Sequence, residues 1–138
     1  MRRATFSSLE DLAPNAVLLD SVSGAGKVVL SSIVSSFEGT EHTQVVPWLE
    51  QMVIATALGG MTPECAATML RLRVNETAYN TMIARHANFR LSDTTSIHNA
   101  RDPRRYFDRL TQPDGDAVVT QLRAERPLFL FQTHDLLV

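Results

Sequence analysis

The feature that most constrains the fold is a short apolar segment followed by a small-residue turn and a second apolar segment. Residues 16–20, Ala-Val-Leu-Leu-Asp, have the continuous apolar pattern of a strand buried on both faces of a parallel sheet. Residues 21–27 form the turn, and residues 28–37 continue as a helix. In this order, turn N–H groups, a helix N-terminus and a lysine can bind one phosphate together. The segment therefore predicts an α/β fold with a phosphate-binding loop.

The turn matches the phosphate-binding motif G-x-x-x-x-G-K-[ST] in part. Gly26 and Lys27 fit the motif, Ser21 replaces its first glycine, and Val28 replaces its final hydroxyl residue. That hydroxyl normally holds the magnesium of a bound nucleotide, and valine has no ligand atom. The loop is therefore expected to bind phosphate without a magnesium ligand of its own. The residues expected to surround the phosphate are Ser23, Gly24, Ala25, Gly26, Lys27, Val28 and Val29. The alternative is an ordinary glycine-rich turn with a solvated lysine.

The bulk composition is that of a globular protein. The 138 residues are 44% hydrophobic and 20% charged, with a net charge of −2, which gives no reason to expect nucleic acid or an anionic membrane as a partner. The apolar region 45–58 is interrupted by Pro47 and Glu50 and is too short to span a bilayer. Cys65 is the only cysteine, which favours a reducing compartment, and no secretory signal follows the N-terminus. We therefore expect a cytoplasmic protein. Its length predicts a single domain, residues 1–138.

Apolar periodicity and helix-start signals predict the helices. The helix at 28–37 carries an apolar stripe, expected to face the sheet, of Val28, Val29, Ile33, Val34 and Phe37. Pro47 begins a second helix, and Thr62 caps a third that extends to about residue 85. In the third helix an apolar residue recurs every four positions from Ala66 to Met82. Two shorter helices follow Asp102 and residues 114–116. Residues 128–131 form a second buried strand, and residues 41–46 form either a short strand or an extended connection.

Two polar regions are less specific. Residues 86–100 form a long loop, of the kind that often binds ligands in compact domains. Four arginines that are close in the sequence resemble an anion site. The negative charges of Asp102 and Asp108 offset theirs, so we expect a solvated face instead. The four arginines are Arg101, Arg104, Arg105 and Arg109. The histidines at 42, 86 and 98 lack metal-ligand spacing, so no metal site is expected.

The number of predicted strands is small for a phosphate-loop domain. A parallel sheet must be covered on both faces, and only the strands at 16–20 and 128–132 are well defined. We therefore expect the chain to be the N-terminal part of a longer domain of this type. Exposed sheet edges would then allow self-association.

The second strand ends in Thr133 and His134. Together with a phosphate loop that lacks the magnesium hydroxyl, this pair resembles the sulfotransferase branch of the P-loop fold. The resemblance covers residues 16–37 and 127–137. It implies sulfuryl transfer from 3′-phosphoadenosine 5′-phosphosulfate to a hydroxyl or amine of a small-molecule acceptor, without a metal. It also implies that His134 is the general base and that Lys27 contacts the donor.

Two departures from that family leave other functions open. Sulfotransferases usually place the basic residue before the Ser-Gly pair, whereas Lys27 follows Gly26, as in a nucleotide kinase. Their 3′-phosphate-binding arginine and serine would lie beyond Val138. The alternatives are a P-loop kinase or other phosphotransferase, which Val28 disfavours, and a non-catalytic nucleotide-binding module. His134 alone could also be a surface histidine at a strand end.

Overall fold

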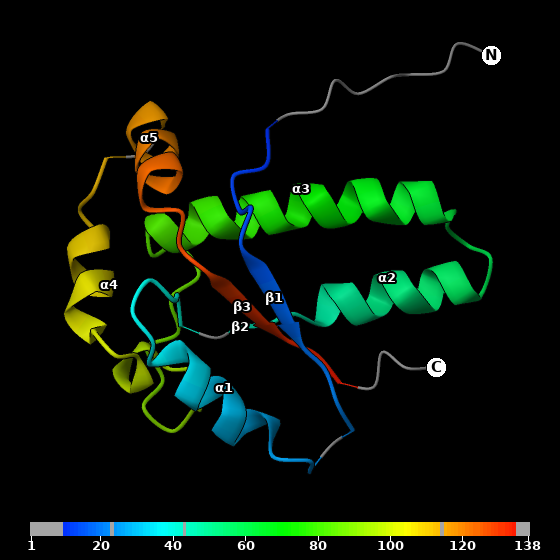
Figure 1. The fold of residues 1–138 in the computed structure, drawn as a ribbon, viewed down its shortest axis with the longest axis horizontal. Helices are drawn as coiled ribbons and strands as arrows, with labels where there is room; N and C mark the ends of the chain where they lie inside the picture. Colours follow the sequence, from blue (N-terminus) through cyan, green and yellow to red (C-terminus); the bar gives the residue numbers. More distant parts are fainter. Residues whose placement is uncertain (1–9, 23, 43, 114, 135–138) are drawn as a thin grey trace.

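The computed structural model describes residues 10–22, 24–42, 44–113 and 115–134, which form an α/β fold (Figure 1). The described strands are β1 (Ala16–Leu19), β2 (Gln44–Val45) and β3 (Phe129–Gln132). The described helices are α1 (Lys27–Ser35), α2 (Pro47–Ala57), α3 (Pro63–Met82), α4 (Pro103–Arg109) and α5 (Asp116–Glu125), with a 3₁₀ turn, η1 (Ile97–Asn99).

The strands form a parallel sheet in the order β1-β3-β2. Ala16 pairs with Phe129 and Leu19 with Gln132, so the end of the described chain lies between the two earlier strands. Both well-defined strands are confirmed to within a residue or two. Gln44 pairs with Phe131, which decides between the two interpretations of residues 41–46 in favour of a short strand.

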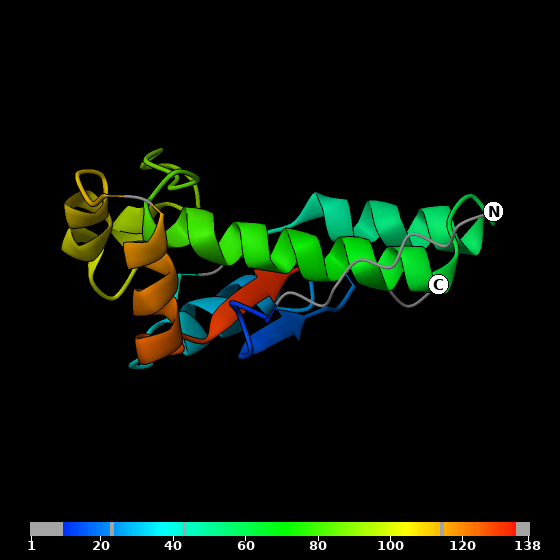
Figure 2. The ribbon, with the colours of Figure 1, turned by 90° about the horizontal axis from the view of Figure 1, so that it is seen from above.

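Helices cover the sheet from two sides. Alternate residues of β3 point to opposite faces: Phe129 and Phe131 pack with α3 and α5, whereas Gln132 contacts α1. Figure 2 shows α2 and α3 running side by side, and α2 extends with α3 away from the sheet (Figures 1 and 2). Of the helices that the structure describes, none is long and apolar enough to cross a membrane.

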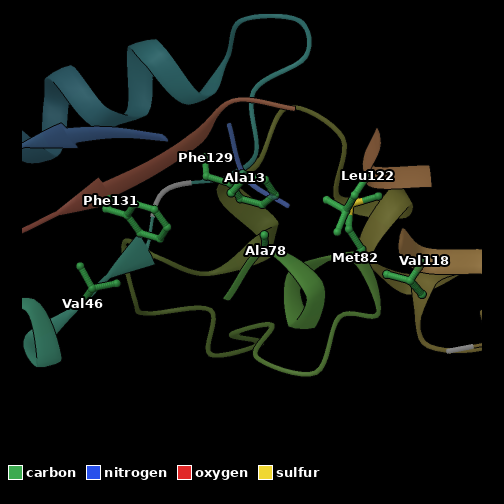
Figure 3. Packing of buried hydrophobic residues seen from close by; sticks show 8 residues of the cluster. All are labelled: Ala13, Val46, Ala78, Met82, Val118, Leu122, Phe129 and Phe131. Carbon is green, nitrogen blue, oxygen red and sulfur yellow. The ribbon is translucent and has the colours of Figure 1, made fainter. Parts of the chain in front are cut away.

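The hydrophobic core lies between β3, α3 and α5. Figure 3 shows Ala78 and Met82 of α3, one turn apart, beside the phenylalanines of β3 and the α5 pair Val118 and Leu122. Trp48 of α2 packs edge-to-face on Phe131, with ring centroids 6.3 Å apart. The predicted four-residue repeat of the third helix is therefore confirmed in its C-terminal half. In its N-terminal half, Leu70 remains partly exposed beside α2.

The helix-start signals are confirmed by the caps. Proline occupies the first turn of α2, α3 and α4. The hydroxyl of Thr62 accepts a hydrogen bond from the N–H of Cys65, and the carboxylate of Asp102 accepts one from Arg105. These side chains satisfy N–H groups that have no acceptor within the helix.

Two burial predictions are wrong. β1 is an edge strand, and Val17 and Leu18 are exposed, although the apolar run predicted burial on both faces. In α1 the apolar residues Val28, Val29 and Ile33 are also exposed, as is Phe37 just after the helix, and the helix instead buries Lys27, Ser31 and Ser35. These three residues are four apart and therefore share one face of the helix, so the face that holds the lysine is the one that meets the sheet.

Candidate functional site

The β1–α1 loop has two glycines in a left-handed conformation next to the N-terminus of α1. Gly24 and Gly26 have φ of 83° and 85°, a left-handed conformation that glycine adopts without a steric penalty. Gly26 is the N-cap of α1 and has no capping side chain, and the first turn contains no acidic residue. The positive end of the α1 dipole is therefore not offset by a carboxylate from that turn.

The predicted phosphate-binding residues lie together in this segment. Gly24, Ala25 and Gly26 form the exposed loop, and Lys27, Val28 and Val29 form the first turn of α1. The side chains of Val28 and Val29 are exposed, so their contribution to a phosphate site would be their backbone N–H groups. Ser23, the remaining predicted residue, lies outside the described residues.

Lys27 is buried at the base of the loop, with only 7% of its surface exposed, which contradicts the alternative of a solvated lysine. Its ammonium group donates to the backbone carbonyls of Ser21, at the end of β1, and Thr133, at the end of β3; the second distance is 2.6 Å. Neither carbonyl carries a charge. Among the described residues, these two carbonyls account for two of the three N–H donors of the ammonium group, and the third can be offered to an anion.

The carboxyl ends of β1 and β3 meet at Thr133, which is fully buried. Its hydroxyl donates to Asp20 Oδ1 over 2.9 Å, and its backbone N–H donates to the carbonyl of Leu19. Ligands of open α/β sheets bind at this end of the strands. Lys27 and His134, which are 107 positions apart in the chain, are therefore brought to the same end, because Lys27 binds the carbonyl of the residue before His134.

His134 is oriented by a carboxylate that the sequence did not indicate. Glu50 Oε1 accepts the backbone N–H of His134 at 2.6 Å and lies 3.4 Å from its Nδ1. The only sequence signal for Glu50 is an acidic residue in the first turn of a helix, where acids are common. A carboxylate next to Nδ1 favours the tautomer with the proton on that nitrogen, which leaves Nε2 as a proton acceptor.

The solvated face predicted for the four arginines is confirmed for Arg101 and Arg104, which are exposed, but not for Arg105, which is half-buried, or Arg109, which is buried. Glu41, fully buried, accepts hydrogen bonds from Arg105, from both terminal nitrogens of Arg109 and from the Tyr106 hydroxyl, all between 2.6 and 2.9 Å. Burial raises the pKa of Glu41, but the bonds and charges of Arg109 and Arg105 outweigh it and lower the pKa. Arg109 is buried too, so this cluster is a structural ion-pair network rather than an open anion site.

Within the described part of the chain, no group of three or more His, Cys, Asp or Glu side chains is placed to hold a metal ion. No protein-family model, no curated protein and no solved structure matches this chain. The function must therefore be inferred from the geometry of the site itself.

Proposed function

We propose that this protein is a phosphate-loop transferase that moves a sulfuryl group from 3′-phosphoadenosine 5′-phosphosulfate to a hydroxyl or amine of a small acceptor. The observation that carries the proposal is the 2.6 Å contact between Lys27 Nζ and the carbonyl of Thr133. It joins the only lysine of the chain to the residue that precedes the candidate base, at the ligand-binding end of the sheet.

The proposed donor site uses the loop and the first turn of α1. The backbone N–H groups at residues 26–28 and the third N–H of Lys27 would bind the oxygens of the 5′ phosphate and the sulfate. Negative charge builds on the bridging oxygen as the leaving group departs. Donors held in place before the reaction stabilise that charge without reorganising. Val28 offers no magnesium ligand, which fits a donor that reacts without a metal.

The proposed transfer step is a displacement at sulfur. The acceptor oxygen or nitrogen forms a bond to sulfur as the bond from sulfur to the bridging phosphate oxygen breaks. 3′-Phosphoadenosine 5′-phosphate leaves, and the proton of the acceptor moves to Nε2 of His134. Glu50, next to Nδ1, would hold the ring in the basic tautomer and stabilise the imidazolium that forms.

The first test measures donor binding by calorimetry with 3′-phosphoadenosine 5′-phosphate, in magnesium and in EDTA. Lys27→Met keeps the length of the side chain but removes its charge, and should weaken binding at least tenfold. Lys27→Arg should retain part of the affinity. Arg90→Met, which removes an exposed positive charge outside the site, should leave the affinity unchanged. EDTA should have no effect on the affinity. A strict magnesium requirement would contradict sulfuryl transfer and support the kinase alternative, which the Gly26-Lys27 order favours.

The second test concerns His134. His134→Ala should lower turnover by about 10²–10⁴-fold, the typical contribution of a positioned base, with donor affinity nearly unchanged. Glu50→Gln should produce a smaller loss of turnover, because the ring loses the carboxylate that orients it. If His134→Ala weakens donor binding and leaves turnover intact, His134 is a donor contact and not the base.

A further inference from the structure

A buried histidine lines a small cavity that no residue of the β1–α1 loop lines. His42 follows Glu41 and is only 7% exposed. Among the described residues, neither Nδ1 nor Nε2 of its ring has a hydrogen-bond partner. The ring lines a cavity of about 30 Å³ with Gln44, Thr81, His86, Asn88, Thr95 and others. Buried polar atoms normally have a partner, so these two nitrogens require an explanation.

The ring is neutral near pH 7. Burial lowers the pKa of His42, although the backbone carbonyls of residues 94–96 and the charge of Glu41 act in the opposite direction. A neutral imidazole has one N–H donor and one acceptor nitrogen. The two nitrogens point in different directions, so one small group cannot bond to both. The nearby carbonyls of residues 94–96 are acceptors for the N–H, and the acceptor nitrogen requires a donor that fits a very small space. A hydroxyl group or a water molecule supplies such a donor and has this size.

The small cavity adjoins a larger one. A cavity of about 300 Å³ shares four of its lining residues, Gln44, His86, Asn88 and Thr95. A volume of this order is at the lower end of the range for small-molecule sites. Trp48 adds an aromatic side chain to the larger cavity. Its two charged lining residues, Arg73 and Glu76, form an ion pair at 2.9 Å, so their charges offset each other.

The polar side chains between the two cavities are held in place. Gln44 Nε2 donates to the hydroxyl of Thr81 over 2.7 Å, which leaves the side-chain oxygen of Gln44 as an acceptor. Asn88 Nδ2 donates to Thr95 Oγ1 over 2.9 Å and so closes the loop that forms one wall. A wall built in this way needs little rearrangement when a ligand enters.

We propose that these two cavities form one binding site for a small uncharged alcohol. The hydroxyl group occupies the inner cavity and donates to the acceptor nitrogen of His42, while the body of the molecule packs beside Trp48 in the outer cavity. A charged head group is disfavoured because the inner cavity is buried and His42 is neutral.

This site is separate from the proposed reaction. Lys27, His134 and Glu50 do not line either cavity. Trp48 and Glu50 are two positions apart on α2, and two residues correspond to about 200° around a helix. The two side chains therefore leave α2 on nearly opposite sides, and the alcohol site can be tested independently of the loop.

The test follows the ring nitrogens of His42 by NMR in the complete, ¹⁵N-labelled chain, with benzyl alcohol as the probe and toluene as its counterpart without the hydroxyl. Benzyl alcohol should shift both His42 nitrogens in a saturable way, and toluene should bind at least tenfold more weakly. Lys27→Met should leave both results unchanged, which separates this site from the donor site. If benzyl alcohol moves neither nitrogen at millimolar concentrations, the inner cavity holds a water only and the proposal is wrong.

Variants provide the second measurement. His42→Phe should lower the affinity for benzyl alcohol at least tenfold, because the ring then offers neither donor nor acceptor. His98→Phe changes an exposed histidine outside both cavities and should have no effect. Near-ultraviolet circular dichroism checks that each variant is folded, and the wild-type titration decides the question if His42→Phe is not. Unchanged affinity in folded His42→Phe would overturn the proposal.

Discussion

Substitution of the buried carboxylate at position 41 should cost more stability than that of an exposed one. Glu41 accepts four hydrogen bonds from Arg105, Arg109 and Tyr106, and Arg109 is 3% exposed. Glu41→Gln preserves the shape of the side chain but replaces one acceptor oxygen by a donor amide. The amide then faces the donors of its former partners and leaves the Arg109 cation buried without a counter-charge.

The size of the effect follows from that geometry. Removing one partner of a buried ion pair typically costs about 3–5 kcal/mol, because the remaining charge stays desolvated. A domain of this size has a total stability of about 5–15 kcal/mol, so Glu41→Gln would remove a large share of it. The matched control is Glu76→Gln, whose ion pair with Arg73 is exposed and should contribute only about 0–1 kcal/mol.

Urea unfolding at pH 7 and 25 °C, analysed by linear extrapolation, measures both variants. A loss below about 1 kcal/mol for Glu41→Gln would refute the reasoning, because it falls well short of the cost of an unpaired buried charge. The pH dependence provides a second check. The folded-state pKa of Glu41 is below its ordinary value of 4.5, so its contribution to stability is complete above pH 4.5 and is lost as the pH falls through the folded-state pKa. Glu41→Gln should make stability less dependent on pH in this acidic range.

Three further predictions test burial, protonation and association. Ser31→Gln should cost about 1–3 kcal/mol by overpacking a buried contact, whereas Val29→Gln should change stability by less than about 0.5 kcal/mol in the same urea assay, because Val29 is 66% exposed. Because burial lowers the folded-state pKa of His42, stability should be complete above its ordinary value of 6.5 and decline as the pH falls below it, and His42→Phe should remove that slope from urea midpoints measured between pH 7.5 and 5.5. The exposed edge of β1 should allow concentration-dependent self-association in sedimentation velocity, and Leu18→Lys should abolish it; a monomer at all concentrations would contradict this expectation.

Most of the secondary structure could be predicted because its signals are local. Proline in the first turn, a Thr or Asp cap and a four-residue apolar repeat each act within a few residues, and α2, α3 and α4 begin where these signals lie. Burial could not be predicted in the same way. An apolar run such as that of β1 is compatible with both a central strand and an edge strand of a parallel sheet. Its place in the order β1-β3-β2 depends on pairing with residues 113 positions away.

The candidate site was predictable only where one general rule applies. Carboxyl ends of parallel strands meet at one edge of the sheet, so a lysine after the first strand and a histidine after the last lie at the same end. Glu50 and Glu41 were missed because their partners are 84 and 68 positions away, and no local pattern encodes such pairs. His42 was considered only as a metal ligand, since a sequence does not show that a histidine is buried without a partner.

The orientation of α1 shows how buried polar contacts can compete with an apolar pattern. Rotating the helix to bury Val29 and Ile33 would gain about 1.5–3 kcal/mol for each side chain that became fully buried. The same rotation would withdraw Lys27 from the carbonyls of Ser21 and Thr133, and hydrogen bonds from a charged group contribute about 1.5–3 kcal/mol each. The two gains are of similar size, so periodicity alone cannot decide between the orientations. With Lys27 held between the ends of β1 and β3, its face of the helix has to meet the sheet, and this face carries Ser31, which donates to Gln132. The exposed apolar side of α1 is therefore a consequence of where the lysine is bound.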